Sequence, residues 1–309
     1  MDFFLIDGNS YFYRAYHAIG ELRSSKGFPT NAIYGFTNMI LKVLREKKPD
    51  AFAIVFDSPA PTERHRMYAE YKAHRPEMPD ELALQIPRIK ETIKAFNIPM
   101  FEIPGYEADD IIGAMAKRAA EQGASVFIVS SDKDMMQVVG SAIRIYDPVK
   151  DTIIDEDYIR ERFGVSPERI SEFMALTGDT ADNIPGVKGI GEKRAKELLL
   201  KAGSLDELLS HPERIENARF RGMITDNIDT INLSKALATI DLDLPVEFNL
   251  DELAVREPDW QALLRLFTEF EFKSLLKMIP AKGYGARGHY ETITDRKQLL
   301  DFLGKASNQ

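Results

Sequence analysis

Short apolar runs alternate with amphipathic helical patterns in the first half of the chain, and this alternation limits the possible folds more than any other feature. Helical patterns at 32–45, 84–96 and 107–120 separate the runs. Strands that alternate with helices predict an α/β fold with a mainly parallel central sheet flanked by helices. The predicted strands are Phe3–Ile6, Ala51–Phe56, Ile98–Ile103, Val126–Val129 and a candidate fifth at Ala142–Tyr146.

Acidic residues stand at or just after the ends of these runs. Ligand sites in parallel sheets lie beyond the carboxyl ends of the strands, so the acidic side chains should meet in one cleft. Each of them alone is explained equally well as a helix cap or a turn residue. A gathered set, however, would raise the pKa values of its members unless cations were present. The set consists of Asp7, Asp57, Glu107, Asp109, Asp110, Asp132 and Asp134.

The composition limits which cation such a cleft can hold. The chain has no cysteine, and its five histidines lack the spacing of a zinc site. Carboxylate oxygens favour Mg²⁺ or Mn²⁺. Because Mg²⁺ takes only one or two carboxylates directly, a set of this size predicts two ions with further carboxylates orienting their waters. Two ions about 4 Å apart clamp the attacking and leaving oxygens of an in-line phosphoryl displacement.

The stretch Leu176–Ala195, LTGDTADNIPGVKGIGEKRA, combines two kinds of chemistry. Asp179 and Asp182 are three residues apart and could share one face of a helical turn. The glycine-rich turn at 184–191 would bring backbone N–H groups close to an anion, at the positive end of a helix that starts near Glu192. The turn resembles the helix-hairpin-helix binders of the DNA backbone, although an ordinary glycine turn between helices is the plainer interpretation. Its flanking cations are Lys188, Lys193 and Arg194.

Cationic and aromatic side chains alternate between Thr62 and Arg75. This mixture suits a nucleic-acid strand, whose phosphates meet the cations and whose bases stack on the rings. A solvated basic helix is the alternative. Three prolines between 76 and 87 predict a loop or a broken helix. Arg14, with Tyr11 and Tyr13, could join the same groove or belong to a helix face packed on the sheet. The residues of the stretch are Arg64, Arg66, Tyr68, Tyr71, Lys72 and Arg75.

Size and charge set further limits. A chain of 309 residues with 44% hydrophobic residues can bury one sizeable core or two modest ones. The net charge of −9 argues against a nucleic-acid partner only until its distribution is considered, because the local field decides what a groove attracts. The N-terminal apolar run lacks a preceding basic region, and no stretch reaches the length of a membrane span. We therefore expect a cytoplasmic location.

Six segments in order resemble the 5′ nuclease, or flap endonuclease, domain at the start of bacterial DNA polymerase I. The resemblance covers about residues 1–280. It implies structure-specific, magnesium-dependent hydrolysis of DNA at 5′ ends, nicks and flaps, and of the RNA primer in a primer–DNA hybrid, by a monomer continuous with polymerase domains. The segments are DGNSYFYRAYHA, FDSPAPTERH, YKAHRPEMP, GYEADD, SSDKDMMQ and LTGDTADNIPGVKGIGEKRA.

The resemblance also implies roles for individual residues. All nine acidic residues named above would bind metal, the set towards Asp132 holding the catalytic ion, and Asp134, Asp179 and Asp182 lying towards the second. Lys72 and Arg75 match arch positions that meet the scissile phosphate, and the ring of Tyr71 would stack on the terminal base. The hairpin turn would also hold K⁺ against backbone carbonyls. The implied catalytic residues are Glu107, Asp132, Lys72 and Arg75. The implied DNA contacts are Arg14, Arg64, Tyr71, Lys72, Arg75, Gly186, Lys188, Gly189, Gly191 and Lys193.

The expected organisation is an α/β nuclease core at 1–175 with an arch at about 62–90, and a helical DNA-binding part at 176–280. Trp260–Met278 is predicted to be an amphipathic helix, and 281–309 to be a linker and the start of a proofreading-exonuclease-like domain. Two other functions stay open: a PIN-like ribonuclease, which needs neither the hairpin nor the arch, and a non-catalytic scaffold that binds DNA ends.

Overall fold

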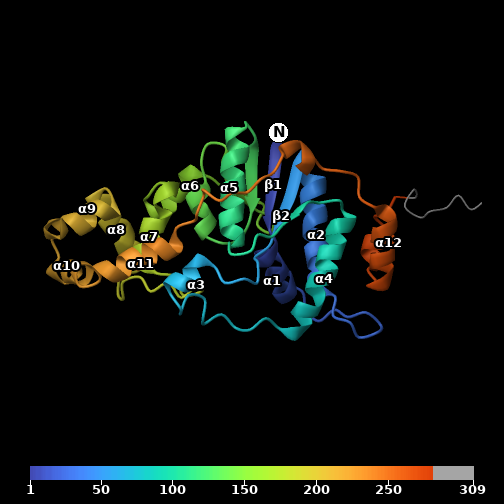
Figure 1. Ribbon diagram of the computed structural model, residues 1–309, viewed down its shortest axis with the longest axis horizontal. Coiled ribbons are helices and arrows are strands. Elements are labelled where there is room, and N and C mark those ends of the chain that lie inside the picture. Colours follow the sequence, from blue (N-terminus) through green and yellow to red (C-terminus); the bar gives the residue numbers. More distant parts are fainter. Residues whose placement is uncertain (281–309) are drawn as a thin grey trace, which may run out of the picture. The chain divides into compact units, whose positions relative to one another are not determined.

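A six-stranded sheet forms the centre of the computed structural model, which describes residues 1–280 (Figure 1). The strand order is β3-β2-β1-β4-β5-β6, and all neighbours are parallel except β5 and β6. The α/β class with a mainly parallel sheet is therefore confirmed. The strands are β1 (Asp2–Asp7), β2 (Ala51–Val55), β3 (Met100–Phe101), β4 (Ser125–Val129), β5 (Ile143–Asp147) and β6 (Thr152–Ile154).

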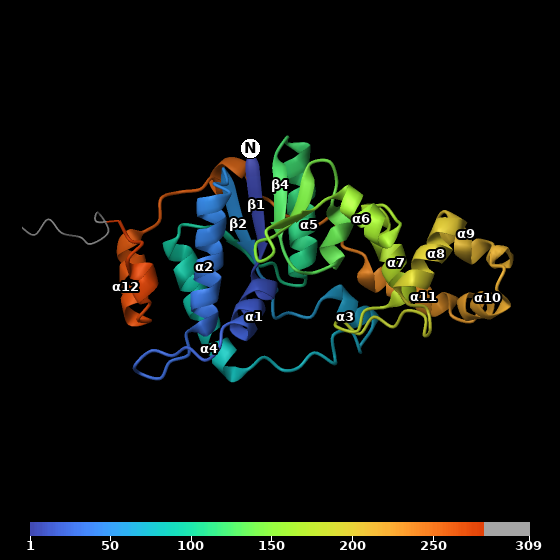
Figure 2. The same cartoon turned by 180° about the vertical axis from the view of Figure 1, so that it is seen from behind.

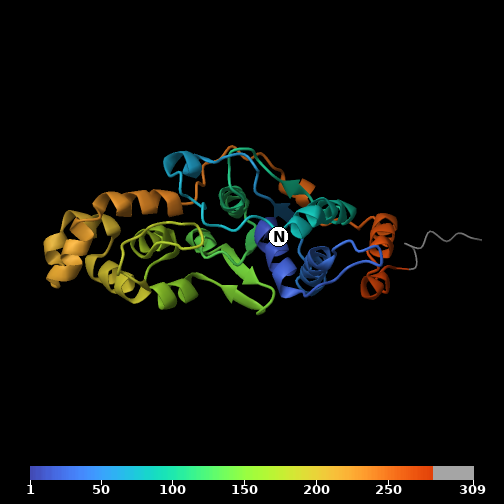
Figure 3. The same ribbon diagram turned by 90° about the horizontal axis from the view of Figure 1, so that it is seen from below.

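Helices cover both faces of the sheet, which explains why its central strands are apolar throughout. Phe3 and Leu5 of β1 are fully buried in the same core cluster as Ile111 and Met115 of α5. The alternate residues of β1 face the other side, where α1, α2 and α4 lie together (Figure 3). These helices are α1 (Gly8–Ala18), α2 (Asn31–Glu46), α4 (Asp80–Ala95) and α5 (Ala108–Glu121), and the short α3 (Glu63–Met67) belongs to the arch.

The strand order places the chain reversal between β1 and β4. The chain runs outward from β1 through β2 to β3 and then returns to β4 on the other side of β1. In open α/β sheets the crevice at such a reversal is the usual ligand site. Residues that follow β1 and β4 therefore lie at the position where a site is expected.

Three local predictions differ from the structure. The polar turn predicted at Asp7–Ser10 is wrong, because α1 begins at Gly8 and the Asp7 side chain caps it by accepting from Ser10 N at 2.9 Å. The third predicted strand shrinks to Met100–Phe101, and the antiparallel β6 was not predicted. Asp179 and Asp182 do not share a helical turn, because they lie in a loop closed by paired backbone hydrogen bonds between Asp179 and Ile184.

Helices on the β4 side of the sheet build most of the rest of the first compact unit, Met1–Pro258, whereas the short helix Leu250–Leu253 packs against β2 (Figure 2). The glycine-rich hairpin connects α7 to α8, as the sequence predicted. The elements are η1 (Asp134–Val138), α6 (Glu156–Phe163), η2 (Pro167–Arg169), α7 (Ile170–Thr177), α8 (Glu192–Ala202), α9 (Leu205–Ser210), η3 (Pro212–Arg214), α10 (Ala218–Thr225), α11 (Ile228–Ala238) and η4 (Leu250–Leu253).

A second compact unit begins at Asp259. The single helix predicted at Trp260–Met278 is wrong, because α12 (Trp260–Glu269) and α13 (Lys273–Leu276) are separated by a break at which Glu271 has a φ of 60°. The predicted linker and following domain at 281–309 lie outside the described residues, and the predicted domain boundaries stay a prediction. No helix within residues 1–280 has the length and apolar character needed to cross a membrane.

The central strands should dominate the stability of the first unit. Ile128 of β4 is fully buried, so Ile128→Ala should lower the free energy of unfolding by about 3 kcal/mol through lost burial and the cavity left behind. Ile153→Ala, at a side chain that is 50% exposed on β6, should change it by less than about 0.5 kcal/mol. Urea denaturation monitored by circular dichroism measures both, and equal effects would contradict this view of the core.

Candidate active site

Carboxylates from three strand ends line the crevice at the chain reversal. Asp7 accepts hydrogen bonds from Ser10 N and from Ser130 Oγ, each at 2.9 Å. Asp57 follows β2 and accepts from Ala108 N at 2.7 Å, so it holds the first turn of α5. Asp132 follows β4 and accepts from Asp134 N at 3.0 Å. These bonds fix the carboxylates at the edge where the sequence placed them.

The start of α5 adds three more acidic residues, which point in two directions. Glu107 is 6% exposed and lies beside the arch, with Lys72 Nζ 3.0 Å from its Oε2. Asp109 interacts electrostatically with Asp132 and Asp7 and so belongs to the cluster. Asp110 is 3% exposed and is paired with Arg64 instead. The structure therefore separates Asp110 from the carboxylates with which it was grouped.

The remaining acidic residues come from the loop after α7 and from the start of η1. Asp179 contacts Lys133 Nζ at 2.7 Å. Asp182 is 6% exposed and contacts Arg75, with Lys72 Nζ at 3.8 Å. Asp134 is 8% exposed, and its Oδ1 is buried with no hydrogen-bond partner. A buried carboxylate oxygen without a partner is unusual and marks a place where a cation fits.

Burial and mutual repulsion raise the pKa values of several carboxylates in the cluster. Burial raises the pKa of Asp7 to about 7, with Asp57 and Asp132 adding to the effect. Burial, followed by neighbouring carboxylates, also raises the pKa of Asp109 and Asp134 well above the usual value, and burial raises the pKa of Asp132. At Asp179 burial acts in the same direction, but the ion pair with Lys133 outweighs it and the pKa is lowered.

The arch is docked onto these carboxylates. Lys72 has a φ of 57°, uncommon for a residue with a side chain, and its backbone N–H donates to Asp182 O at 2.9 Å. Its ammonium lies between Glu107 and Asp182. Tyr71, predicted to stack on a base, is only 4% exposed, and its hydroxyl donates to Glu107 at 3.1 Å. The predicted loop or broken helix is confirmed for residues 62–75, where only Glu63–Met67 is helical, but Pro87 does not break its helix because it lies inside α4.

The residues predicted to bind duplex DNA lie on the hairpin after α7. Gly186 has a φ of 57°, and a Cβ there would come within 2.2 Å of Gly178 N, so both residues must be small for the hairpin to close on α7. The N–H of Gly186 donates to Ser234 Oγ of α11 at 3.1 Å. Lys188 and Lys193 are exposed, and Gly191 precedes α8 without a side-chain cap. The hairpin thus presents exposed cations and an open helix N-terminus.

Two other predicted DNA contacts are already engaged with protein groups. Arg14 Nη1 is 3.5 Å from Asp147 Oδ1, and its guanidinium carbon is 5.9 Å from the centre of the Tyr11 ring. Arg64 is buried at the base of the arch. The exposed or half-exposed cations nearest the carboxylates are Arg75 and Lys133, whose side chains are 45% and 46% exposed.

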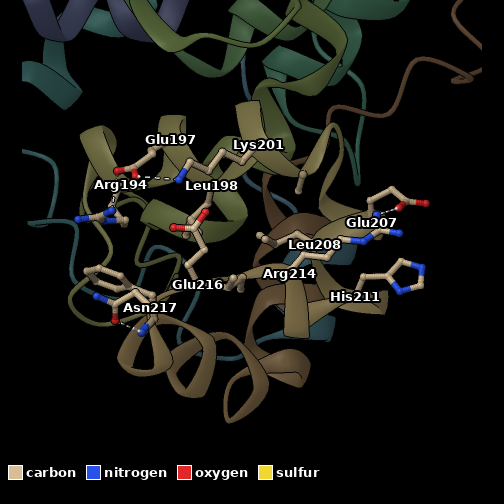
Figure 4. A pocket seen from close by; sticks show the side chains of 13 residues that line it. Arg194, Glu197, Leu198, Lys201, Glu207, Leu208, His211, Arg214, Glu216 and Asn217 are labelled. Atoms are coloured by element: carbon tan, nitrogen blue, oxygen red, sulfur yellow. Dashed lines mark hydrogen bonds and ion pairs between the residues drawn. The ribbon is translucent and has the colours of Figure 1, made fainter.

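A pocket of about 250 Å³ in the helical part is distinct from this site (Figure 4). Its walls come from α8, α9 and α10, and Leu198 and Leu208 form an apolar floor. Arg194 contacts Glu197 at 2.5 Å, and Arg214 contacts Glu207 at 2.9 Å (Figure 4). Because Arg194 and Arg214 already have carboxylate partners, the pocket offers a less favourable place for an anion than the exposed lysines of the hairpin do.

Within residues 1–280, no three His, Cys, Asp or Glu side chains are grouped so that they hold a metal ion. Lysine and arginine side chains contact Glu107, Asp179 and Asp182 instead. The donor set nevertheless fits a hard divalent ion, because it offers only carboxylate oxygens, and one of them, on Asp134, is buried without a partner.

Several residues that position the site were missed in the sequence. Ser130 links Asp7 to the Asp132 loop, since its hydroxyl donates to Asp7 and accepts from Asp132 N at 3.0 Å. Asn9 Oδ1 accepts from Asp57 N at 3.0 Å. Lys133 lies between Asp132 and Asp134 in the sequence, and this position indicates that its ammonium pairs with a nearby carboxylate, which in the structure is that of Asp179. No local sequence pattern indicates the roles of Ser130 and Asn9, because their partners Asp7 and Asp57 lie far from them in the sequence.

Known proteins resemble this chain over most of its length. Residues 2–164 match the family model of the 5′-3′ exonuclease N-terminal resolvase-like domain, and residues 165–261 match the 5′-3′ exonuclease C-terminal SAM fold. The chain is 40% identical to a 5′-3′ exonuclease of Aquifex aeolicus over 276 residues, covering 89% of this chain and 94% of that one. It is 38% identical to DNA polymerase I of Caldicellulosiruptor bescii, covering 97% of this chain and 36% of that one.

Solved structures show the same fold at lower identity. A zinc-bound T5 5′-exonuclease matches with a TM-score of 0.63 and 21% identity, over 78% of this chain and 90% of that one. The catalytic core of Rad2 with a DNA substrate matches with a TM-score of 0.62 and 18% identity, over 89% and 90%.

The raised pKa of Asp7 should be measurable as pH-dependent stability. The unfolded chain releases this proton near pH 3.8, whereas the folded protein keeps it up to about pH 7. In metal-free buffer the wild type should therefore lose stability between these values as the pH rises, and the isosteric Asp7→Asn variant should lose less, by up to a few kcal/mol. Urea unfolding in EDTA at pH 4, 6 and 8 checks this. Identical pH profiles for the two proteins would contradict the assignment.

Proposed function

The chain belongs to the 5′-3′ exonuclease family, and from this premise we propose that it hydrolyses DNA at 5′ ends, nicks and 5′ flaps, and RNA primers annealed to DNA, by a two-metal-ion mechanism. As a member of this family it is a nuclease. The observation that supports the finer proposal is the gathering of buried carboxylates at the β1–β4 crevice, beside a basic arch and close in sequence to a glycine-rich hairpin with exposed lysines.

The carboxylates fit Mg²⁺ or Mn²⁺ by their chemistry. One ion would be held by Asp7, Asp57, Glu107, Asp109 and Asp132, and a second ion by Asp134, Asp179 and Asp182. Bound divalent ions would neutralise the cluster and stabilise the negative charge that develops on the phosphodiester. Asp110 remains a predicted ligand, although its carboxylate is paired with Arg64.

Lys72 and Arg75 would bind the scissile phosphate. In the free protein they contact Glu107 and Asp182, so a phosphate that enters the crevice competes with these carboxylates for the same cations. Neutralisation of the carboxylates by divalent ions would weaken this competition and release both side chains towards the substrate. Stacking of Tyr71 on a base would require its ring to leave the buried position beside Glu107.

The hairpin would hold the duplex next to the crevice. Backbone N–H groups at Gly189 and Gly191, the N-terminus of α8, and the exposed Lys188 and Lys193 supply contacts to phosphates that carry no sequence information. Carbonyl groups of the same turn would hold the K⁺ ion implied by the family resemblance. Binding of this kind supports recognition of DNA structure instead of base sequence.

The proposed setting is the N-terminal part of a DNA polymerase I acting in primer removal and DNA repair, in the cytoplasm at the nucleoid. The chain spans about a third of the length of the polymerase I relatives that it matches, but nearly all of the Aquifex aeolicus exonuclease. Its relatives therefore include both longer polymerases and a separate exonuclease. The polymerase setting is supported by the alignment to the Caldicellulosiruptor bescii protein, which extends over 307 residues.

Cleavage of a 5′-flap duplex tests the proposal directly. The wild type should cut it with Mg²⁺ and not with EDTA, and Asp132→Ala should lower kcat by about 100-fold or more while the protein stays folded. A 5′-flap of RNA on the same duplex tests the primer activity. Cleavage that needs neither the ion nor Asp132 would contradict the mechanism, and binding without cleavage would favour the scaffold alternative. Cleavage of free single-stranded RNA alone would favour the PIN-like ribonuclease.

Lys72 and Lys188 should divide catalysis and binding between them. Lys72→Ala should reduce kcat by about 10- to 100-fold with a small change in Kd for the flap duplex, because its ammonium meets the reacting phosphate. Lys188→Ala should mainly raise Kd and reduce the salt dependence of binding by the contribution of about one phosphate contact. Single-turnover kinetics and fluorescence anisotropy separate the two quantities. Equal effects of both substitutions on both quantities would refute this division.

A further inference from the structure

Arg64 lies in the stretch predicted to contact a DNA strand, yet its side chain is only 11% exposed. Nη1 donates to Glu107 Oε2 at 3.2 Å and to Asp110 Oδ2 at 2.6 Å. Nη2 donates to Asp110 Oδ1 and to Thr239 O, both at 2.7 Å, and Nε donates to Leu237 O at 2.9 Å. A guanidinium has five N–H donors, so every donor of Arg64 has an acceptor within the protein and none is left for a phosphate.

These bonds join three segments that are far apart in the sequence. Arg64 is on α3 at the base of the arch, Glu107 and Asp110 are at the start of α5, and Leu237 and Thr239 lie at the end of α11. The chain after α11 is fixed a second time, because Asp241 N donates to Asp110 Oδ1 at 2.9 Å. Both oxygens of Asp110 are therefore occupied by protein donors.

Glu107 depends on the same arrangement for its orientation. Its Oε2 accepts from Arg64 Nη1 and from Tyr71 at 3.1 Å, and it pairs with Lys72 at 3.0 Å. Tyr71 and Lys72 belong to the part of the arch that would contact phosphate in the proposed reaction. Arg64, in contrast, is held by backbone carbonyls and by Asp110. Of these three donors, Arg64 is the one that is also bonded to Asp110 of α5 and to carbonyl groups at the end of α11.

We propose that Arg64 is a positioning residue, whose guanidinium orients Glu107 towards the carboxylate cluster and fixes the base of the arch, and that Asp110 is its counter-ion and not a metal ligand. This inference rests on the proposed function for its kinetic consequences but not for its structural ones. A planar fork is required, since a single ammonium cannot reach two carboxylates and two carbonyls at once.

Arg64→Lys separates positioning from a contact with DNA, because it keeps the charge and removes the fork. It should lower kcat on a 5′-flap duplex by about 30-fold or more, leave Kd for that duplex in EDTA within about twofold, and leave the salt dependence of binding unchanged. Arg169→Lys is the matched control, since Arg169 makes a two-bond contact to Glu172 away from the crevice, at 2.9 and 3.0 Å. A weakened Kd with an unchanged kcat would overturn the proposal in favour of a phosphate contact.

Asp110→Asn provides the second variant, which keeps the proposal testable if Arg64→Lys does not fold. Its effect on kcat should not multiply with that of Arg64→Lys, because both remove the same interaction. The number of Mn²⁺ ions bound, counted by electron paramagnetic resonance, should be unchanged in Asp110→Asn and reduced in Asp132→Asn. Loss of an ion from Asp110→Asn, or multiplied effects on kcat, would overturn the proposal.

Limited proteolysis gives a reading that does not depend on catalysis. Without metal or DNA, cleavage between residues 62 and 75 should be several-fold faster in Arg64→Lys than in the wild type or Arg169→Lys. Unchanged cleavage would overturn the proposal. If instead the wild type fails to cut DNA while the proteolysis and ion counts come out as expected, the proposed nuclease reaction fails and the positioning role of Arg64 stands.

Discussion

Repulsion between buried carboxylates is the constraint on which the rest of this architecture depends. The strand order brings the ends of β1 and β4 together, and the N-terminus of α5 adds Glu107 and Asp109 to the same crevice. The positive end of α5 relieves part of the repulsion. Lys72, Arg75 and Lys133 relieve more, but they pair with only three of the carboxylates. Burial, together with the remaining negative charge, raises the pKa values of Asp7, Asp109 and Asp134, and both would be relieved by a cation in the crevice.

The same electrostatics connect the site to the segments that would hold DNA. Two hydrogen bonds to backbone carbonyls fasten the arch to the hairpin region: Lys72 N donates to Asp182 O at 2.9 Å, and the side-chain Nδ2 of Asn183 donates to Glu70 O at 2.7 Å. Arg64 fastens the base of the arch to α5 and to the end of α11. A change in charge at the carboxylates therefore acts on the arch directly, without a separate transmitting element. This arrangement would couple ion binding to the release of cations for the substrate.

The sequence predicted much of this site because its acidic residues follow strands, and strand ends in a parallel sheet meet at one edge. Periodicity alone could not predict how Asp109 and Asp110 divide, since adjacent helical residues diverge in direction and only the position of Arg64 decides which one faces the cluster. The burial of Tyr71 and Arg64 could not be predicted either. Alternating cationic and aromatic residues give the same sequence pattern in a surface that binds a DNA strand and in an arch that packs against the protein. The break at Glu271 depends on a left-handed backbone that the composition did not reveal.

The central claim is that the crevice exchanges side-chain cations for divalent ions. Anomalous scattering from crystals of the wild-type protein soaked in Mn²⁺ tests it most directly. We expect one peak among Asp7, Asp109 and Asp132 and a second towards Asp134, Asp179 and Asp182, with the Lys72 ammonium moved away from Glu107. Absence of Mn²⁺ from the crevice, with Lys72 and Lys133 still paired as in the metal-free protein, would contradict it.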